Sequence, residues 1–193
     1  MFLITFILAL EFYLAIKFAI VGTKFGWVGL GGSEAGVVLL TLPKSPRKAA
    51  LSEVKEFAAD AVEDTSAFGD LPYRLQRYFY GDKVSFSDSL DLSGATDFQK
   101  AVWNATRFIP YGETRTYAWV ARQIGSSHAC RAVGGALARN TFPIMVPCHR
   151  VIASNGNPGG FSGGLALKRR LLRLEAALPD VISQIPAVTI LHD

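Results

Sequence analysis

The sequence predicts an α+β protein, in which a small unit of sheet plus helices precedes a mostly helical, winged-helix-like unit. Strand-like segments punctuated by glycine fill much of the chain before residue 42. Helical hydrophobic spacing dominates beyond residue 93. The charge also changes, with 9 Lys+Arg against 11 Asp+Glu up to residue 92 and 11 against 5 thereafter. We therefore expect domains at 12–92 and 93–180, the second being either a polyanion-binding module or simply a basic surface.

The N-terminal unit combines strands with two helices. Residues 12–42 have strand character, and a hairpin-like turn is expected at 31–35. Hydrophobic spacing and alternation place the remaining elements. These are strands at 25–30, 36–40 and 85–92, and helices at 51–62 and 71–80. No residue in this unit marks a reaction site.

The C-terminal unit begins with a helix whose start is marked by a capping box. Thr96 and Gln99 have the spacing at which a hydroxyl and an amide satisfy the first N–H groups of a helix. One face of this helix is apolar. It consists of Phe98, Ala101, Val102, Ala105, Phe108 and Ile109.

Two further helices are expected to form a helix-turn-helix pair. The first runs from about residue 116 to 124 and is stopped by Gly125, and Ser126 or Ser127 caps the second. The buried stripe of the second helix is predicted to be Ala129, Ala132, Val133, Ala136 and Leu137. Because small residues surround Arg131, this helix can approach another surface closely with one cation projecting. The alternative is tight helix packing with Arg131 solvated.

The two ends of the chain have separate predictions. Residues 1–22 are strongly apolar but lack a basic segment and a cleavage site of the secretory type. Glu11 and Lys17 would be desolvated in a membrane-spanning helix. We therefore favour a hydrophobic extension leading into a first strand over a membrane anchor. Residues 181–193 are expected to form a C-terminal tail.

Cys148 is the candidate nucleophile. It lies in the segment Pro147-Cys148-His149-Arg150-Val151, directly after an apolar run. A free thiol has a pKa of about 8.5, so a reactive cysteine needs a base and an electropositive setting, which the adjacent His149 and Arg150 could supply. In an extended strand, however, neighbouring side chains point to opposite faces, so a direct contact requires a turn, a helix or a bridging water. The alternative is a buried structural cysteine.

The remaining cysteine and histidine residues predict neither a disulfide framework nor a metal site. Cys130 is the second of only two cysteines, and we interpret it as structural. Two cysteines in a basic chain without a signal segment point to free thiols in a reducing compartment. The three histidines have no zinc-ligand spacing.

Several segments together resemble the O6-alkylguanine-DNA alkyltransferase (methylated-DNA–protein-cysteine methyltransferase) family. The segment around Cys148 resembles the active-site signature of that family, and further blocks follow in the family's order and spacing from Phe98 to Glu175. These are Ile109 to Glu113, Thr116-Tyr117, Arg131 to Ala136, Arg139-Asn140, Gly159 to Leu165 and Lys168 to Glu175. The resemblance in the N-terminal half is looser and centres on the hairpin at 25–40.

The resemblance implies a set of catalytic roles. Cys148 resembles the acceptor nucleophile, and His149 the base that reaches its thiol through an ordered water. Glu175 resembles the carboxylate that orients His149, an arrangement with the logic of a catalytic triad. Asn140 resembles the residue that ties the turn before the cysteine segment. Tyr117 resembles the group that crowds the target phosphate, hydrogen-bonds the flipped guanine and donates a proton to it.

The resemblance also implies how substrate and DNA are bound. Arg131 resembles a finger that enters the base stack from the minor groove, and Tyr117 doubles as a DNA contact. The other DNA-contacting residues are expected to be Ala132 and Gly134. The base pocket is expected to be formed by Pro143, Val151, Phe161 and Ser162. Phe161 departs from the family, in which many members have tyrosine there, so a hydrogen-bond donor is lost and tolerance of bulky alkyl groups is expected to change.

The function implied is direct reversal of DNA damage, in which an alkyl group moves irreversibly from O6-alkylguanine to Cys148, once per molecule. The expected partner is double-stranded DNA containing alkylated guanine, bound through its minor groove by a monomer without cofactor, metal or obligate protein partner. A cytoplasmic, DNA-associated location is expected. Whether O4-alkylthymine also reacts stays open. The rival functions are a lesion sensor without repair activity, a cysteine hydrolase and a transcription regulator.

Overall fold

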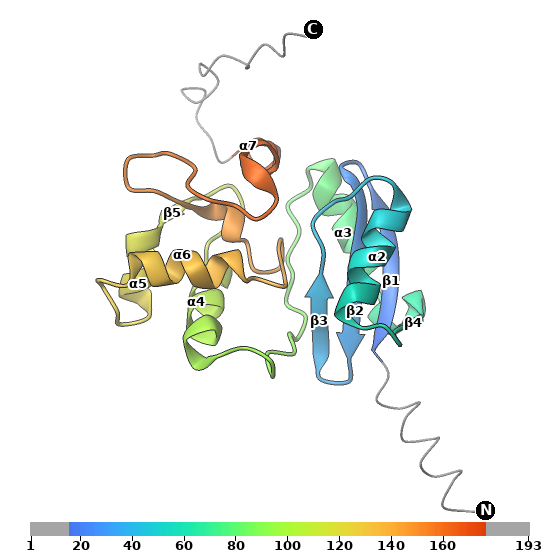
Figure 1. Cartoon of the computed structure of the whole chain (residues 1–193). Coiled ribbons are helices and arrows are strands. Elements are labelled where there is room, and N and C mark those ends of the chain that lie inside the picture. The colour runs from blue at the N-terminus through green and yellow to red at the C-terminus, as the bar shows by residue number, and fades with distance from the viewer. Residues whose placement is uncertain (1–15, 177–193) are drawn as a thin grey trace, which may run out of the picture.

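The computed structural model describes residues 16–176 and confirms the α+β class (Figure 1). The N-terminal half (residues 16–92) contains the sheet, and the C-terminal half (residues 93–176) is mostly helical. Expectations for residues 1–15 and for the tail at 181–193 lie outside the described residues. Within the described residues, no helix has the length and hydropathy needed to cross a membrane.

A four-stranded sheet with the order β3-β2-β1-β4 forms the centre of the N-terminal half. The first three strands are antiparallel neighbours, and β4 pairs parallel to β1. The helices α2 and α3 cover opposite faces of this sheet (Figure 1). The elements are β1 (Lys17–Thr23), β2 (Gly26–Ser33), β3 (Gly36–Leu40), α2 (Arg47–Phe57), β4 (Val62–Glu63), the 3-10 turn η1 (Thr65–Phe68) and α3 (Leu71–Tyr80).

The hairpin and α3 agree well with the predicted pattern, but several boundaries differ. The predicted helix at 71–80 is confirmed. The turn is shorter than expected, because β2 continues through a register shift at Gly31/Gly32 as far as Ser33. The predicted helix at 51–62 is displaced, since α2 starts directly after Pro46 and ends at Phe57. Val62 instead pairs with Lys17 in the sheet.

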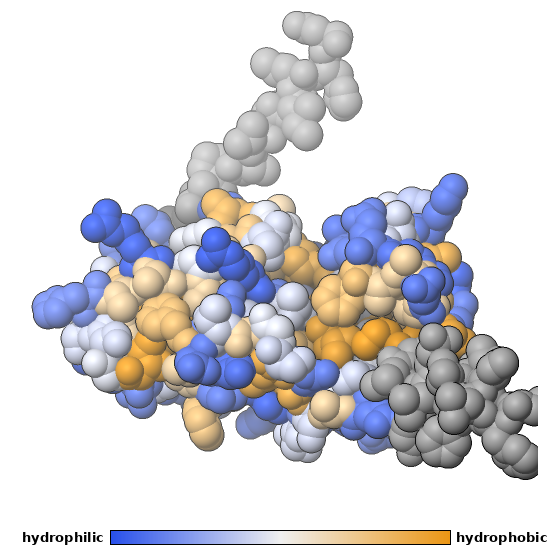
Figure 2. Space-filling model, turned by 60° about the horizontal axis from the view of Figure 1, so that its bottom comes forward, coloured by the Kyte–Doolittle hydropathy of each residue, from blue (hydrophilic) through white to orange (hydrophobic). Residues whose placement is uncertain are grey.

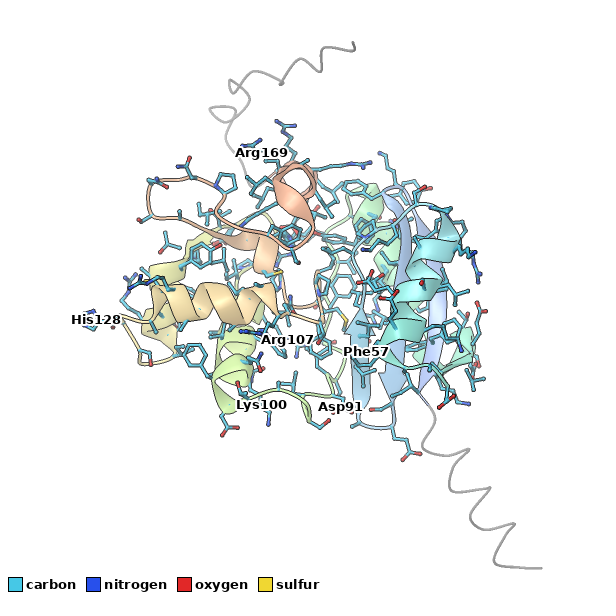
Figure 3. All side chains as sticks on the ribbon, viewed as in Figure 1. Phe57, Asp91, Lys100, Arg107, His128 and Arg169 are labelled. Carbon is cyan, nitrogen blue, oxygen red and sulfur yellow. The ribbon has the colours of Figure 1, made fainter. Side chains whose placement is uncertain are left out.

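The predicted strand at 85–92 is wrong. This segment forms one isolated bridge, between Leu90 and Val37, and is otherwise a connecting strap. Its carbonyl groups at Phe86 and Asp88 accept hydrogen bonds from the Arg107 guanidinium, at 3.1 and 3.2 Å. Figure 3 shows Arg107 between the two halves. Because the Arg107 side chain satisfies these two carbonyl groups, the segment 85–92 does not need a continuous strand partner despite its alternating hydrophobic pattern.

The C-terminal half is built from four helices and a two-stranded parallel ladder between β5 and β6. The predicted capping box is confirmed, because Gln99 N donates to Thr96 Oγ1 and Thr96 N donates to Gln99 Oε1. The elements are α4 (Asp97–Arg107), β5 (Arg115–Thr116), α5 (Tyr117–Gln123), α6 (Cys130–Ala138), the 3-10 turn η2 (Cys148–Arg150), β6 (Val151–Ile152) and α7 (Gly164–Leu174).

The junction between α5 and α6 differs from the prediction in its second part. Gly125 ends α5 as expected, with a φ of 70° and a hydrogen bond from Ser126 N to Ala121 O that is typical of a Schellman motif. The α6 helix begins only at Cys130, and its N-cap residue, Ala129, makes no side-chain hydrogen bond. The predicted Ser126 or Ser127 cap is therefore wrong, because Ser126 belongs to the end of α5. In the predicted buried stripe, Ala132 is exposed.

The two halves share one hydrophobic cluster. Core residues from the sheet and α3 pack continuously with those of α4, α5, α6 and α7. Backbone hydrogen bonding also crosses between the halves, since Leu40 N donates to Thr141 O at 2.8 Å. The underside of the molecule carries hydrophobic patches on both halves, bordered by hydrophilic side chains (Figure 2). On this face, surface hydropathy therefore does not distinguish one half from the other.

Candidate active site

The candidate nucleophile lies in a tight turn. Cys148 N donates to Val146 O at 2.7 Å, which closes a three-residue turn around Pro147, and Arg150 N donates to Pro147 O at 2.9 Å. Proline suits this position because its φ is fixed near the −79° that the turn adopts. The segment is thus a turn and not an extended strand, which removes the objection that neighbouring side chains must face apart.

Asn140 fixes this turn to the end of α6. Its Nδ2 donates to Val146 O at 2.9 Å and lies 3.2 Å from Cys148 Sγ. Its Oδ1 accepts from Phe142 N at 2.9 Å. One amide side chain therefore connects the loop after α6, the turn and the sulfur atom.

His149 and Glu175 are in contact. Both side chains are buried, and His149 Nε2 lies 2.8 Å from Glu175 Oε1. Because a carboxylate only accepts, Nε2 carries the hydrogen and Nδ1 is the free acceptor of the neutral ring. Nδ1 is buried without a hydrogen-bond partner among the residues the structure describes. The ring therefore presents an unused basic nitrogen.

Glu175 is the centre of a dense hydrogen-bond network. Arg150 binds it with two groups, Nε to Oε2 at 2.8 Å and Nη2 to Oε1 at 2.9 Å. Gly112 N donates to Oε2 at 3.3 Å, and the Tyr78 hydroxyl donates to Oε1 at 2.6 Å. Burial alone would raise the pKa of Glu175, but the hydrogen bonds from His149 and Arg150 outweigh burial and hold it at about 2. The carboxylate is therefore ionised at all ordinary pH values.

The protonation states at rest are a neutral imidazole and a protonated thiol. Burial lowers the pKa of His149, although Glu175 opposes this effect. Burial also raises the pKa of the Cys148 thiol, and the hydrogen bond from Asn140 offsets only part of the rise. The basic neighbours of Cys148 therefore do not bring the pKa of its thiol below the usual value. The guanidinium of Arg150 is engaged by Glu175, so a base has to remove the thiol proton during the reaction.

Cys148 lines a small pocket between α5, α6 and the glycine-rich loop before α7. Cys148 is only 6% exposed, but it lines a hollow of about 360 Å³. The lining residues are Tyr117, Gly134, Leu137, Ala138, Cys148, Gly160, Phe161 and Ser162. The pocket therefore joins the predicted nucleophile to four of the other predicted substrate- and DNA-contacting residues, namely Tyr117, Gly134, Phe161 and Ser162.

The β5–β6 ladder positions Tyr117 at this pocket. It pairs Thr116, immediately before Tyr117, with Ile152, shortly after the cysteine turn. The Tyr117 hydroxyl makes a long contact of 3.5 Å to Gly160 O. A side chain at position 159 would place its Cβ 2.8 Å from the same hydroxyl, so only glycine fits there. Burial raises the pKa of Tyr117, which keeps the hydroxyl protonated.

Lys168 supports the pocket by binding Gly160, one of its lining residues. It is fully buried in α7, and its Nζ donates to Val151 O at 2.6 Å and to Gly160 O at 3.3 Å. Desolvation lowers its pKa to about 8. Lys168 therefore ties the segment after the cysteine turn to the glycine-rich loop.

The other predicted site residues lie in different places. Arg131 and Ala132 are exposed on α6. Val151 and Pro143 are buried next to the site but do not line the pocket of Cys148. Pro143 instead lines a neighbouring hollow beside Asn140 and Ser162.

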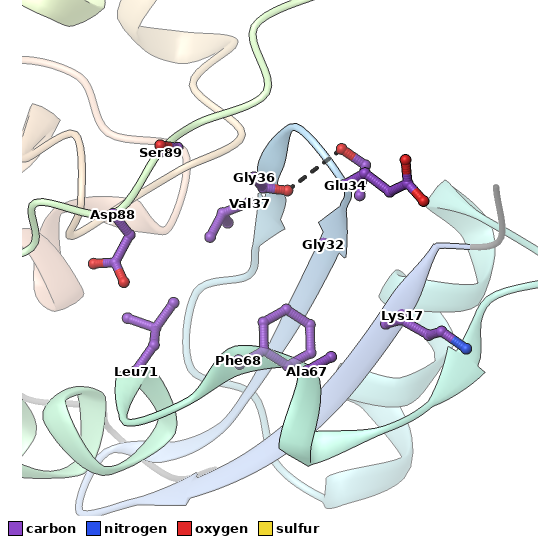
Figure 4. Close-up of a pocket in the computed structure, with 11 residues that line it drawn as sticks. Lys17, Gly32, Glu34, Gly36, Val37, Ala67, Phe68, Leu71, Asp88 and Ser89 are labelled. Atoms are coloured by element: carbon purple, nitrogen blue, oxygen red, sulfur yellow. Dashed lines mark hydrogen bonds between the residues drawn. The ribbon is translucent and has the colours of Figure 1, made fainter. Parts of the chain in front are cut away.

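A larger hollow of about 610 Å³ lies in the N-terminal half, between the tip of the β2–β3 hairpin, η1 and the strap (Figure 4). Val37, Phe68 and Leu71 line it, and it contains neither cysteine nor histidine. It is separate from the nucleophile. His128 is also remote, since it points outward at the far end of the C-terminal half (Figure 3). Among the described residues, no group of three or more potential ligands could hold a metal ion.

Two contributors to the site were not predicted from the sequence. Tyr78 was expected only to lie within the helix at 71–80, and the backbone N–H of Gly112 was not considered. Both reach Glu175 across long stretches of sequence, 97 and 63 residues respectively. A buried tyrosine needs a partner for its hydroxyl, but no local pattern identifies that partner.

The comparisons with known proteins agree with this geometry. Residues 97–177 match the family described as 6-O-methylguanine DNA methyltransferase, DNA binding domain. A methylated-DNA–protein-cysteine methyltransferase of Methanosarcina acetivorans is 42% identical over 160 residues, which cover 83% of this chain and 98% of that protein. The Mycobacterium tuberculosis protein of the same name is 50% identical over 112 residues, 58% of this chain and 67% of that protein.

Solved structures give the same result. The crystal structure of Mycobacterium tuberculosis OGT in complex with DNA matches with a TM-score of 0.70 and 38% identity, covering 83% of this chain and 93% of that chain. The O6-methylguanine-DNA methyltransferase of Pyrococcus kodakaraensis matches with a TM-score of 0.63 and 25% identity, covering 83% and 98%. The similarity therefore extends through both halves of the fold.

Proposed function

This chain belongs to the methylated-DNA–protein-cysteine methyltransferase family, and we propose that it repairs DNA by moving an alkyl group from O6-alkylguanine to Cys148. The observation that carries the proposal is the position of Cys148 on a pocket beside a buried His149–Glu175 pair. The relatives are named methylated-DNA–protein-cysteine methyltransferases, which is the same chemistry. The active species is a thiolate formed on demand, since the thiol is protonated at rest.

His149 acts as the general base. Its free Nδ1 accepts the thiol proton through a bridging water, while Nε2 keeps its hydrogen bond to Glu175. The carboxylate, ionised throughout, stabilises the imidazolium that forms. Asn140 and Lys168 favour the developing negative charge on sulfur, because both lower the thiol pKa against the effect of burial.

The transfer itself is a displacement at the alkyl carbon. The electron pair of the Cys148 sulfur forms the new C–S bond, the bond from carbon to O6 breaks, and its pair passes to guanine. The protonated hydroxyl of Tyr117 donates a proton to the departing base, which leaves neutral. The proton held by His149 and the one given by Tyr117 then equilibrate through solvent. The thioether has no easy route of reversal, so each molecule reacts once.

DNA is bound through α6, with the damaged nucleotide flipped into the pocket. A base inside the duplex is out of reach of a cysteine, and extrusion costs a few kcal/mol. The exposed Arg131 fills the vacated space from the minor groove and offsets part of this cost. Small residues at Ala132 and Gly134 allow the close approach. Phosphate contacts from the basic half supply affinity that does not depend on sequence. The base pocket is completed or supported by Val151, Phe161, Ser162 and Pro143.

We further propose that the protein acts as a cytoplasmic monomer.

Mapping of the alkyl adduct tests this function. The full chain is incubated with a duplex oligonucleotide containing O6-methylguanine, digested and analysed by mass spectrometry. We expect one added methyl group on the peptide that contains Cys148, with a yield that does not exceed one per protein molecule. Cys148→Ala is expected to bind the duplex and to gain no methyl group. Turnover without an adduct would instead indicate a hydrolase, and binding without modification would indicate a lesion sensor.

A further inference from the structure

Tyr78 connects the N-terminal half directly to the catalytic pair. It lies in α3, and its side chain is completely buried. Its hydroxyl donates to Glu175 Oε1 at 2.6 Å and lies 3.3 Å from His149 Nε2. The hydroxyl therefore lies beside both groups that activate the thiol, although it comes from the half of the chain without any predicted reaction site.

The surrounding aromatic rings hold this hydroxyl in place. The Tyr78 ring makes edge contacts with Phe79, Phe86 and Tyr111, with ring centroids 5.2, 5.9 and 6.1 Å apart. Such packing fixes the ring plane and hence the direction of the O–H bond. Phenylalanine could satisfy the packing alone. The hydroxyl is not needed for this packing, and its partners among the described residues are Glu175 and His149.

The Tyr78 hydroxyl competes with His149 for the charge of Glu175. Oε1 accepts hydrogen bonds from Tyr78, His149 and Arg150, so its negative charge is divided among three donors. Burial raises the pKa of Tyr78 well above its usual value, so this group remains a donor. The titratable and charged groups around the His149–Glu175 pair come from α3, the loop after α4, η2 and α7 with its C-cap. They are Tyr78, Tyr111, Cys148, Arg150, Lys168 and Glu175.

We propose that Tyr78 is a positioning residue for alkyl transfer, holding Glu175 Oε1 against His149 while weakening that oxygen as an acceptor, so that the imidazole stays neutral until it takes the thiol proton. Tyr78 itself transfers no proton. The inference rests on the proposed function for its catalytic meaning. It also assigns the N-terminal half a direct part in the site.

The matched variants Tyr78→Phe and Tyr80→Phe test the proposal. Both remove one hydroxyl from α3, but Tyr80 is 66% exposed, and its hydroxyl is not among the described donors to Glu175. The rate of reaction with free O6-benzylguanine is measured in single turnovers across the pH range. In Tyr78→Phe we expect the acid limb of the rate–pH profile to shift to higher pH by about one pH unit. The reason is that loss of a hydrogen bond to a charged group changes the pKa of its neighbour by roughly that much. On the acid limb the rate of Tyr78→Phe is then about tenfold below that of the parent, and on the plateau the two rates agree within about twofold.

Nuclear magnetic resonance titration of the His149 ring provides a second measurement that does not depend on catalysis. We expect the His149 pKa to rise in Tyr78→Phe and to be unchanged in Tyr80→Phe. Site-specific 3-fluorotyrosine at position 78 keeps both the ring and the hydroxyl but strengthens the donor, so it is expected to lower the His149 pKa. These pKa shifts are expected even if no alkyl adduct forms on Cys148. Absence of the adduct would reject only the proposed function. An unchanged titration and pH profile in Tyr78→Phe, with only a loss of stability, would reduce Tyr78 to a core residue and overturn the inference.

Discussion

At the scale of single residues, the sulfur of Cys148 is subject to opposing effects. Burial disfavours the thiolate, whereas the neutral donor of Asn140 and the cation of Lys168 favour it. Asn140 is the more direct of the two, since its Nδ2 lies 3.2 Å from Sγ. The same side chain also satisfies two backbone groups, so its effects on reactivity and on stability are linked.

Asn140→Ala is therefore expected to lower both the reaction rate and the stability. The thiolate loses its hydrogen-bond donor, so we expect the single-turnover rate with O6-benzylguanine to fall about tenfold or more. Val146 O and Phe142 N lose their partner, which is expected to reduce the free energy of unfolding by about 1–3 kcal/mol. The matched control is Asn104→Ala, at an exposed position of α4. A parent-like rate in Asn140→Ala would show that this hydrogen bond does not assist ionisation.

The sequence was informative about residue identity but not about the residues' surroundings. Cys148, His149 and Glu175 follow from the family resemblance, and the structure brings the last two to 2.8 Å. The burial that raises the thiol pKa could not be predicted, because it depends on tertiary packing of α5, α6 and the glycine-rich loop around the cysteine turn. The engagement of Arg150 by Glu175, 25 residues away, is equally invisible in local spacing.

At the scale of elements, α6 combines exposed and buried faces as a surface-binding helix requires. Val133, Ala136 and Leu137 are buried against the core, while Arg131 and Ala132 are exposed. The arginine lies near the start of the helix, on the same element as Gly134, which lines the pocket of Cys148. The proposed DNA contact and the pocket of the proposed nucleophile are thus connected through one short helix.

Arg131→Ala is expected to separate base flipping from chemistry. Repair of O6-methylguanine in duplex DNA should fall far more than reaction with free O6-benzylguanine, because the free base needs no extrusion. Arg131→Lys keeps the charge without the planar guanidinium, and Lys48→Ala removes a charge from exposed α2. We expect Arg131→Lys to be intermediate and Lys48→Ala to be close to the parent. Equal losses in the duplex and free-base assays would contradict the proposed role of Arg131.

Element prediction succeeded where the local signal determined the structure. The capping box at Thr96 and the terminator at Gly125 act through their own backbone neighbours, and both were identified. The start of α6 was missed because Ser126 is used in ending α5, so a favourable capping residue was unavailable to the next helix. The strap at 85–92 was mistaken for a strand because its carbonyls are satisfied by the distant Arg107.

At the scale of the whole molecule, the shared core packs the two halves against each other. Hydrophobic side chains from the sheet, α3 and the C-terminal helices form one cluster. Glu175 adds a polar connection, since it binds Tyr78 from one half and His149 and Arg150 from the other. Disruption of this carboxylate should therefore affect the stability of both halves together.

The dependence of stability on pH provides the test. The pKa of Glu175 in the folded protein is about 2, below its ordinary value of 4.5. A depressed carboxyl pKa contributes stability that is fully present above pH 4.5 and is lost as the pH falls toward 2. The difference corresponds to on the order of 3 kcal/mol. In Glu175→Gln this contribution is absent, and the buried Arg150 also loses its ionic partner, so the variant should be strongly destabilised at neutral pH.

We therefore expect the gap in unfolding free energy between the parent and Glu175→Gln to narrow as the pH is lowered from 5 toward 2. Urea unfolding followed by tryptophan fluorescence and by circular dichroism measures this gap, with Trp27 in one half and Trp103 and Trp119 in the other. Because the core is shared, both signals should follow a single transition. Glu34→Gln, at the exposed hairpin tip, is the matched control and should keep a constant gap to the parent. A gap for Glu175→Gln that does not change with pH would mean that this carboxylate is not the ionised centre joining the two halves.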